Sequence, residues 1–232
     1  FSNQAPRLRY MSGGQTSVPL TVIAPTGPSG SAAAHHSDNP HGMLMGLPGI
    51  KIASPSSAAD FKGLLIESIR EPNPVVFFAD LMLLGKKGDV PEGAYSIEFG
   101  KADVKREGTD VTVVAIGSTV PQALEVADQL AETGVSVEVI DPRTLVPFDW
   151  DAVAKSVSKT GRLVAVDPNR ETCGAASEII TQAVERCWSQ LKAQPQRVTW
   201  PNVPMPYSPP LEKAVVSDLD DIRRAIELTL KS

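Results

Sequence analysis

The chain has 232 residues, 42% of them hydrophobic and 21% charged, with a formal net charge of −5. This composition is typical of a globular protein with a buried core and excludes collagen-like and intrinsically disordered classes. The acidic balance argues against nucleic acid as a partner, and no apolar run approaches the about 20 residues that cross a bilayer, so we expect no membrane partner either.

The first 15 residues, FSNQAPRLRYMSGGQ, resemble the end of a helix that runs into a Gly-Gly turn. They include no initiator methionine and do not have the polar character of a disordered leader. We therefore expect an upstream part of the natural protein to lie outside this sequence.

Short β-branched runs then alternate with longer amphipathic ones, as in strand-helix-strand units around a mostly parallel sheet. The predicted elements are a strand over 18–24, a loop over 25–34, a short helix before a strand over 50–53, a helix over 57–70 and a strand over 74–79. Ser56 or Ser57 is the expected N-cap of the 57–70 helix, and Pro72 is expected to stop it.

Residues 81–100, LMLLGKKGDVPEGAYSIEFG, break this rhythm with Gly, Pro and mixed charge, so we place a domain boundary there. Beyond it the pattern predicts strands over 110–117, 135–141, 162–167 and 197–200, and helices over 119–134, 149–159, 174–192 and 217–230. A proline-rich turn, PNVPMPYSPPLEK, precedes the last helix and is expected to be a rigid docking surface. The pattern predicts open twisted sheets with helices on both faces.

Two cysteines, Cys173 and Cys187, are too few and too isolated for a disulfide framework. This usage fits a reducing compartment, and we expect the bacterial cytoplasm, or the mitochondrial matrix if the source is eukaryotic. Cys173 precedes a Gly-Ala-Ala-Ser run, where close helix packing is expected. Arg143 could bind an anion, but the sequence favours a structural ion pair.

All three histidines, His35, His36 and His41, lie within the stretch SAAAHHSDNPH. Two hypotheses explain this clustering: a transition-metal site, which needs several ligands, and an acid/base loop, which needs one placed imidazole. Adjacent side chains on an extended loop point in different directions, and only Asp38 and Asp60 lie close by in sequence. The spacing therefore favours an acid/base loop, with the remaining histidines solvated or packed within the loop.

The order of motifs resembles a known family, the β subunit of the thiamine-diphosphate-dependent decarboxylating component of 2-oxo acid dehydrogenase complexes. The motifs are RYMSGG, HHSD, PGIKIASPSSAADFKGLL, REPNPVVFF, FGKADVKREGTDVTVVAIG, VEVIDPRTLVPFD, KTGRLVAVD and PMPYSPPLEKA. The resemblance covers essentially the whole chain. It implies an α/β fold, in which a truncated pyrimidine-binding-type α/β domain (1–85) and a linker (86–97) are followed by a transketolase carboxy-terminal-like three-layer α/β domain (98–232).

The resemblance also implies an oxidoreductase subunit. The family's enzymes contain two α and two β chains, hold thiamine diphosphate and magnesium at the α/β interface, and decarboxylate pyruvate or a related 2-oxo acid. The acyl group passes to a lipoyl arm on the dihydrolipoyl acyltransferase core. A close relative cleaves acetoin instead, so that alternative stays open. The expected partners are therefore an α subunit, a second β chain and that core.

One residue of this sequence matches a catalytic position of the family. His36 stands where the family has the histidine of a His-Ser-Gln motif, with Asp38 here in place of the glutamine. The resemblance implies that His36 orients the substrate carboxylate or protonates the lipoyl sulfur. The glutamate that activates the cofactor is expected upstream of Phe1, so no cofactor-binding residue is assigned within the chain, and the chain alone is expected to be inactive.

A potassium site is also carried over from some family members, at the carboxy-terminal end of the 57–70 helix. Unpaired carbonyl oxygens and the negative end of the helix dipole suit a monovalent cation there. The matching positions are Leu20, Ser68, Ile69, Glu71 and Asn73. A proline-terminated helix without an ion is the alternative, because Pro72 replaces a non-proline residue.

Two hypotheses from other classes remain. The chain could be an assembly module that pairs with itself or an α chain and docks the acyltransferase without catalysis. It could also be a transketolase-like enzyme that acts on sugar phosphates, although no cluster of Arg and His suited to such a substrate is visible.

Overall fold

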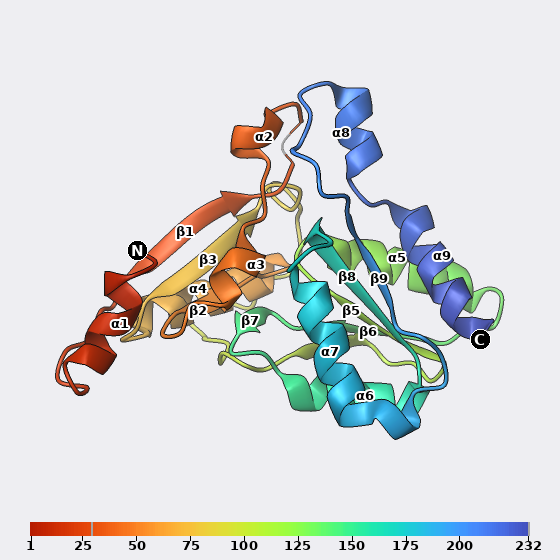
Figure 1. The fold of residues 1–232 in the computed structure, drawn as a ribbon, viewed down its shortest axis with the longest axis horizontal. Coiled ribbons are helices and arrows are strands. Elements are labelled where there is room, and N and C mark those ends of the chain that lie inside the picture. The colour runs from red at the N-terminus through yellow and green to blue at the C-terminus, as the bar shows by residue number, and fades with distance from the viewer. Residues whose placement is uncertain (29, 232) are drawn as a thin grey trace.

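The computed structural model describes residues 1–28 and 30–231, which form two units built on two separate sheets (Figure 1). The first unit begins at the amino terminus, and β7 from later in the chain joins its sheet. Its elements before the boundary are α1 (Gln4–Met11), β1 (Thr21–Thr26), α2 (Ala33–His36), α3 (His41–Met45), β2 (Lys51–Ala53), α4 (Ala58–Arg70) and β3 (Val75–Asp80).

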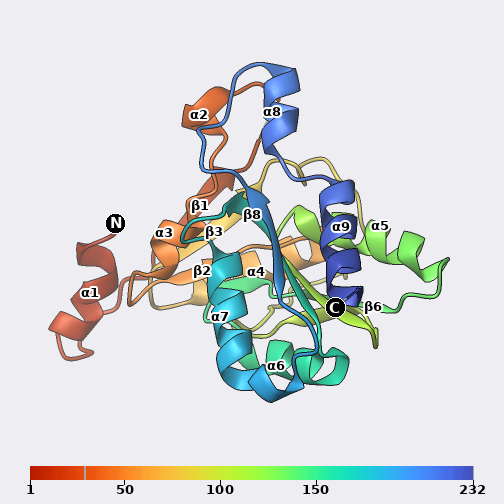
Figure 2. The same cartoon turned by 45° about the vertical axis from the view of Figure 1, so that its right-hand side comes forward.

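The second unit follows a long connection over residues 81–102. The elements after this connection are β4 (Asp103–Arg106), β5 (Val111–Ala115), α5 (Thr119–Ala131), β6 (Val137–Asp141), β7 (Thr144–Val146), α6 (Trp150–Thr160), β8 (Leu163–Arg170), α7 (Ala175–Cys187), a 3-10 turn η1 (Trp188–Gln190), β9 (Gln196–Trp200), α8 (Pro209–Val215) and α9 (Leu219–Leu230). All of them except β7, which joins the first sheet, belong to the second unit. Figure 2 shows α7 and α9 on either side of β8.

The first sheet has the order β1-β3-β2-β7. Its β1, β3 and β2 run parallel, whereas β7 pairs antiparallel with β2. Successive side chains of a strand point to opposite faces. On β3, Phe77 therefore packs with Leu64 of α4, whereas Phe78 packs in the other direction, against the second unit. This explains why all six residues of β3 are buried.

The second sheet has the order β4-β6-β5-β8-β9 and helices on both faces. On β5, Val113 and Ala115 face a cluster with α5 and α9, whereas Val114 faces a cluster with α6 and α7. Alternate side chains of β5 therefore pack against different helical layers, as expected for a strand buried on both faces. The three-layer α/β arrangement predicted for this unit is confirmed.

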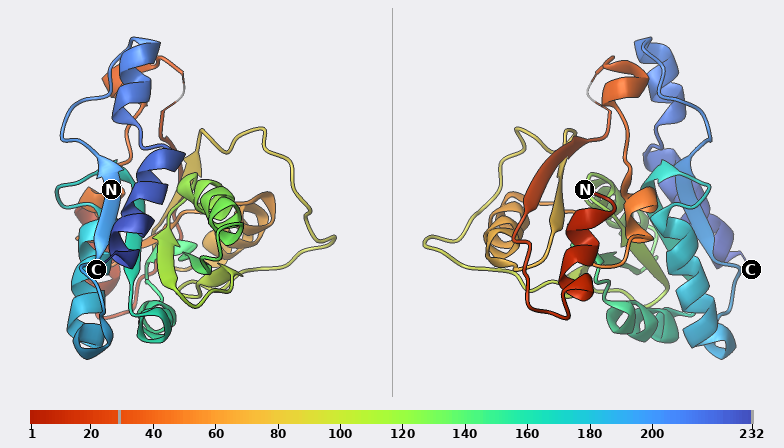
Figure 3. Two further views of the ribbon diagram at one scale, coloured as in Figure 1. Left: turned by 90° about the vertical axis from the view of Figure 1, so that its right-hand side faces the viewer. Right: turned by 60° about the vertical axis from the view of Figure 1, so that its left-hand side comes forward.

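One hydrophobic cluster spans both units. It contains Ile52, Val76 and Phe78 of the first sheet together with Ile140 and Ile179 of the second unit. Because shared apolar burial stabilises an interface in proportion to its area, the two units are held together by a continuous core as well as by β7. Figure 3 shows that the connection over 81–102 instead extends away from both sheets.

The helix ends follow the expected chemistry. Ser57 is the N-cap of α4, where its hydroxyl accepts a hydrogen bond from the backbone of Asp60, as predicted. Gly161 ends α6 with a φ of 75°, a left-handed conformation that glycine adopts without strain. None of the helices in the described part of the chain has the length and apolar character needed to cross a membrane.

Several short elements lie where no strand or helix was predicted. These are β4, β7, α2 and α8. β4 has the sequence DVKR, with no buried residue and no apolar run, so it is defined by its pairing with β6. α8 begins at Pro209, and Pro209 and Pro210 both suit the first turn of a helix. The sequence predicted a proline-rich turn at this place.

Candidate functional site

The loop after β1 carries the candidate catalytic histidine. Gly27 turns the chain with a φ of 84°, and a side chain there would come within 3.2 Å of an Asp80 carboxylate oxygen. The chain then rises into α2, whose last residue is His36, and both His35 and His36 are exposed. Figure 1 shows α2 beside α8, away from both sheets.

The three histidines do not converge. His41 is buried, and its Nε2 lies 2.7 Å from Oδ1 of Asp167, whereas His35 and His36 face solvent on α2. Among the described residues, no group of three or more His, Cys, Asp or Glu side chains is arranged to hold a metal ion. His35 and His41 were expected to be solvated or packed within the loop; His35 is solvated, whereas His41 instead pairs with Asp167 of the second unit.

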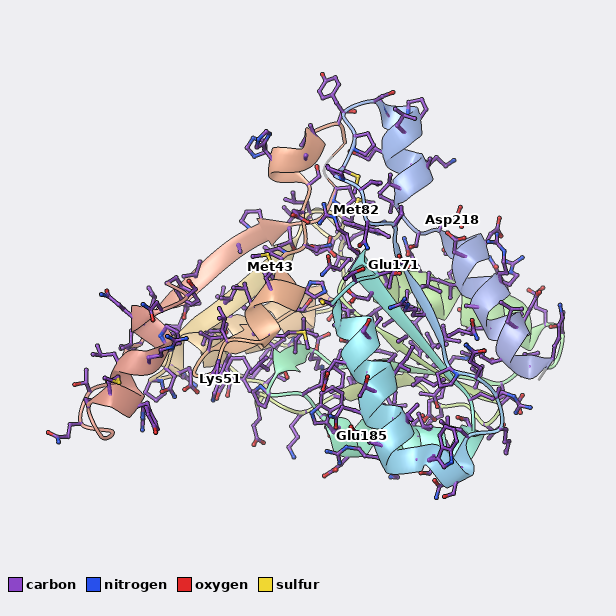
Figure 4. The ribbon with its side chains drawn as sticks, viewed as in Figure 1. Met43, Lys51, Met82, Glu171, Glu185 and Asp218 are labelled. Carbon is purple, nitrogen blue, oxygen red and sulfur yellow. The ribbon has the colours of Figure 1, made fainter. Side chains whose placement is uncertain are left out.

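Residues 38–41 dock onto the end of β8 in the second unit. The Arg170 guanidinium donates to Asp38 at 2.6 Å, the side-chain amide of Asn39 donates to the carbonyl of Pro168, and His41 pairs with Asp167. We call this set of contacts the loop anchor. In Figure 4, Met43 and Glu171 mark the neighbourhood where α3 and the end of β8 meet.

The backbone approaches closely beside the loop anchor. A side chain at Gly42 would lie 2.5 Å from the carbonyl oxygen of Cys173, so only glycine fits at the start of α3. Cys173 is exposed and has a φ of 57°. It lines a groove of about 760 Å³ together with Met45, Phe148 and Trp150. The close packing predicted near Cys173 is therefore present, with α3 as the partner.

A second polar contact between the units surrounds Lys105. Its ammonium lies 2.8 Å from Asp60, 2.7 Å from Asp103 and 3.7 Å from Asp141. Arg143 pairs with Asp60 and Asp103, both at 2.8 Å, which is the structural ion pair predicted for it. We call these five residues the interdomain ion cluster, because Asp60 belongs to α4 of the first unit and the others to the second.

Two carboxyl groups of the interdomain ion cluster, those of Asp141 and Asp60, have pKa values shifted in opposite directions. Burial raises the pKa of Asp141 to about 6, although a hydrogen bond from Ser56 and the charge of Lys105 favour its ionised form. Burial also acts to raise the pKa of Asp60, but hydrogen bonds from Lys105 and Ser57 outweigh it, and that pKa lies below its ordinary value. Asp141 therefore takes up a proton before Asp60 as pH falls.

The positions matched to a potassium site lie at or beside the end of α4. The carbonyl of Ser68 accepts from Thr21 at 2.8 Å, the carbonyl of Leu20 accepts from the backbone of Val75 at 2.9 Å, and the Asn73 amide donates to Glu71. Ile69 is 65% exposed and its side chain has no oxygen, so it could contribute only its backbone carbonyl.

Lys51, which the sequence did not suggest, supplies a cation at this place. Its ammonium lies 2.6 Å from Glu71, and burial, which would raise the pKa of Glu71, is outweighed by hydrogen bonds from Lys51 and Asn73, so that pKa is lowered. Lys51 also lies over the Phe99 ring, 5.1 Å from its centre. In Figure 4, Lys51 lies apart from Met43 and Glu171, which mark the neighbourhood of the loop anchor.

Sequence reasoning missed Asp167, the buried partner of His41. One signal could have found it: Asp167 ends the buried run LVAV of β8, and polar residues at the carboxyl ends of parallel strands gather at functional edges. The sequence could not show that the edge of the second sheet faces the histidine loop of the first unit.

Comparison with known proteins gives two family matches. Residues 2–87 match the family described as "Transketolase, pyrimidine binding domain" and residues 100–222 match "Transketolase, C-terminal domain". A solved structure titled "Split gene transketolase, inactive beta4 tetramer" superposes with a TM-score of 0.72 at 22% identity, covering 99% of this chain and 73% of that one. This likeness shows the fold alone.

Three curated relatives are more similar in sequence. The chain is 43% identical to the "Acetoin:2,6-dichlorophenolindophenol oxidoreductase subunit beta" of Bacillus subtilis, over 95% of this chain and 64% of the relative. It is 42% identical to the protein of the same name from Cupriavidus necator, over 99% and 68%. It is 40% identical to the "Pyruvate dehydrogenase E1 component subunit beta" of Bacillus subtilis, over 89% and 64%. The chain thus spans about two thirds of the length of these relatives.

Proposed function

Since the chain belongs to the family of transketolase-like dehydrogenase β subunits, we propose that it is the larger part of a β subunit that acts with an α partner in the oxidative decarboxylation of pyruvate or a related 2-oxo acid. The acyl product would pass to a lipoyl group on an acyltransferase core. The observation that carries the proposal is similarity along nearly the whole chain, 40% identity over 89% of it for the pyruvate dehydrogenase relative. The compartment would be the bacterial cytoplasm or the mitochondrial matrix.

The reaction explains the need for a cofactor. Thiamine diphosphate supplies an electron sink that no side chain provides when a 2-oxo acid loses carbon dioxide. The accompanying magnesium would be held with the cofactor at the interface with the α partner. The activating glutamate would lie in the part of the subunit upstream of Phe1.

The task we propose for this chain is proton handling and orientation by His36. An imidazole exchanges protons near neutral pH and can donate to a carboxylate or a sulfur atom. The exposed position of His36 on α2 lets it face a partner subunit or an incoming lipoyl arm. His36 would thus orient the substrate carboxylate or protonate the lipoyl sulfur.

A potassium ion at the end of α4 is part of the proposal. The carbonyls of Leu20 and Ser68 each accept one hydrogen bond from the protein, and each oxygen keeps a second lone pair for an ion. Lys51 already neutralises Glu71, so the ion would rest on carbonyl oxygens. Replacing sodium chloride by potassium chloride at equal ionic strength should raise the melting temperature. Equal melting temperatures in the two salts would refute the potassium site.

Acetoin cleavage is the second candidate, because two relatives named for acetoin are 43% and 42% identical, slightly above the pyruvate dehydrogenase relative. The decisive experiment reconstitutes the full-length β subunit with its α partner. Turnover is then compared for pyruvate, branched-chain 2-oxo acids and acetoin with a dye acceptor. Turnover of none of them by a folded, assembled complex would refute catalysis and favour a non-catalytic assembly module.

A further inference from the structure

Nothing in the described part of the chain holds the His36 imidazole itself: no hydrogen bond or ion pair involves it. Contacts on both sides of it fix the loop instead. Upstream, the backbone amide of Ser31 donates to Glu212 of α8 at 3.0 Å. Downstream, Asp38 accepts from Arg170 at 2.6 Å. The place of His36 therefore depends on residues of the second unit.

The strongest of these contacts is the buried pair of His41 and Asp167. Their side chains are 4% and 0% exposed, and the two atoms are 2.7 Å apart. Asp167 is fixed from its other side as well, because its second oxygen accepts from the backbone of Ala176 at 3.0 Å, at the start of α7. Charge-assisted hydrogen bonds to a carboxylate held in this way are strong and directional.

The first unit orients the His41 ring too. Phe78 of β3 packs edge-on against it, with ring centres 6.0 Å apart. Gly42 directly afterwards rests on the carbonyl of Cys173, where no side chain fits. The imidazole therefore has one orientation set jointly by both units, and the backbone on either side of it has little room to shift.

We propose that His41, Asp167 and the pair of Asp38 and Arg170 are positioning residues for His36. The second unit would fix the loop geometry through them, so that the His36 imidazole meets the reacting group at a defined place. This inference rests on the proposed function for its catalytic consequence. Its structural half, that the loop anchor orders residues 30–40, stands independently.

The test uses the full-length β subunit assembled with its α partner. The charge-reversal variants Asp38→Arg and Arg170→Asp each break the outer pair, and the double variant restores it with opposite polarity. Arg186→Asp is the matched control, because Arg186 pairs with exposed Asp151 at 3.5 Å on the far part of α7. Backbone hydrogen exchange over residues 30–40 is measured together with kcat and KM for the preferred substrate.

Each single reversal should speed exchange over residues 30–40 and lower kcat by about 10- to 100-fold, because small misplacements of a catalytic group are that costly. KM should change by less than about threefold, because the proposal gives the anchor residues a positioning role and no role in substrate binding. The double variant should recover most of kcat but not all, because Arg170 also donates to the carbonyl of Val203. The Arg186→Asp control should match the wild type.

The inner pair provides an independent arm. His41→Gln keeps a side-chain donor that can reach Asp167, whereas His41→Ala keeps none, so the glutamine variant should retain clearly more activity. Faster exchange with unchanged kcat in every variant would overturn the positioning role. Unchanged exchange would overturn the loop anchor itself. If the wild-type complex turned over no substrate, the proposed function would fail, and the exchange data alone would still decide whether the second unit orders the loop.

Discussion

The two polar contacts between the units differ in what they hold. The interdomain ion cluster joins regular elements, since Asp60 lies on α4, Asp103 and Lys105 on β4, and Asp141 at the end of β6. The loop anchor joins the end of β8 to residues 38–41, which lead from an irregular segment into the first residue of α3. Buried charges between rigid elements affect folding when one partner is removed, whereas a tether on a loop affects where the loop stands. The first contact should therefore govern stability and the second activity.

The largest expected effect tests the loop. In the reconstituted full-length complex, His36→Ala should lower acyl transfer by about 10²- to 10⁴-fold, the usual contribution of a general acid or base. The melting temperature should stay within about 1 °C of the wild type, because His36 is exposed. His35→Ala is the matched control, since His35 is an exposed neighbour on the same helix. Equal and small losses for both variants would remove His36 from the mechanism.

The next effect tests the ion cluster. Lys105→Met removes a cation that faces Asp60, Asp103 and Asp141, two of which are almost fully buried. We expect the free energy of unfolding to fall by about 3 kcal/mol, the low end for breaking a buried pair, because Lys105 keeps 18% exposure. Urea denaturation measures the change.

The control for this variant is Arg224→Met, which removes an exposed pair with Asp221 within α9. Its cost should stay below about 0.5 kcal/mol. Losses of the same size in both variants would mean that the cluster contributes no more than a surface ion pair, and the contrast between the two contacts would be lost.

A pH series isolates Asp141. Its pKa is about 6 in the fold, above the ordinary 3.8, so the folded state binds the proton more tightly and Asp141 costs stability as pH rises from about 4 to 6. Asp60 and Glu71, whose pKa values are lowered, act in the opposite sense and lose their stabilising effect at lower pH.

Comparing Asp141→Asn with the wild type cancels the other groups. Relative to the wild type, the free energy of unfolding of the variant should rise by up to about 3 kcal/mol between pH 4 and pH 7. Asparagine has nearly the same shape and does not titrate, so packing stays constant across the series. A difference that does not change with pH would show that Asp141 titrates normally.

The last prediction concerns transition metals, whose removal should have no effect. Removal of transition metals from the folded chain by a chelator should leave the melting temperature unchanged, because the described histidines do not converge on one another. A melting temperature that falls with chelator and recovers with zinc would revive the metal hypothesis for the three histidines.

The strongly patterned elements were predictable from sequence. Short β-branched runs identified the buried strands β3, β5 and β8, and the capping chemistry identified the start of α4. The family resemblance read from the motifs is confirmed by the sequence comparisons. The short elements β4 and β7 were not predictable, because they have three or four residues and form only where a neighbouring strand offers its edge.

The sequence by itself determined the α/β class, the two kinds of unit and the family, whereas its choice of His36 from three histidines stays a prediction. Only the tertiary structure decided that β7 completes the first sheet, that His41 pairs with Asp167, and that Lys105 gathers three carboxylates. The physical reason is the range of the interactions. Propensity, periodicity and capping act within a few residues, whereas these contacts join groups up to 126 positions apart, which only the packing of two units brings together.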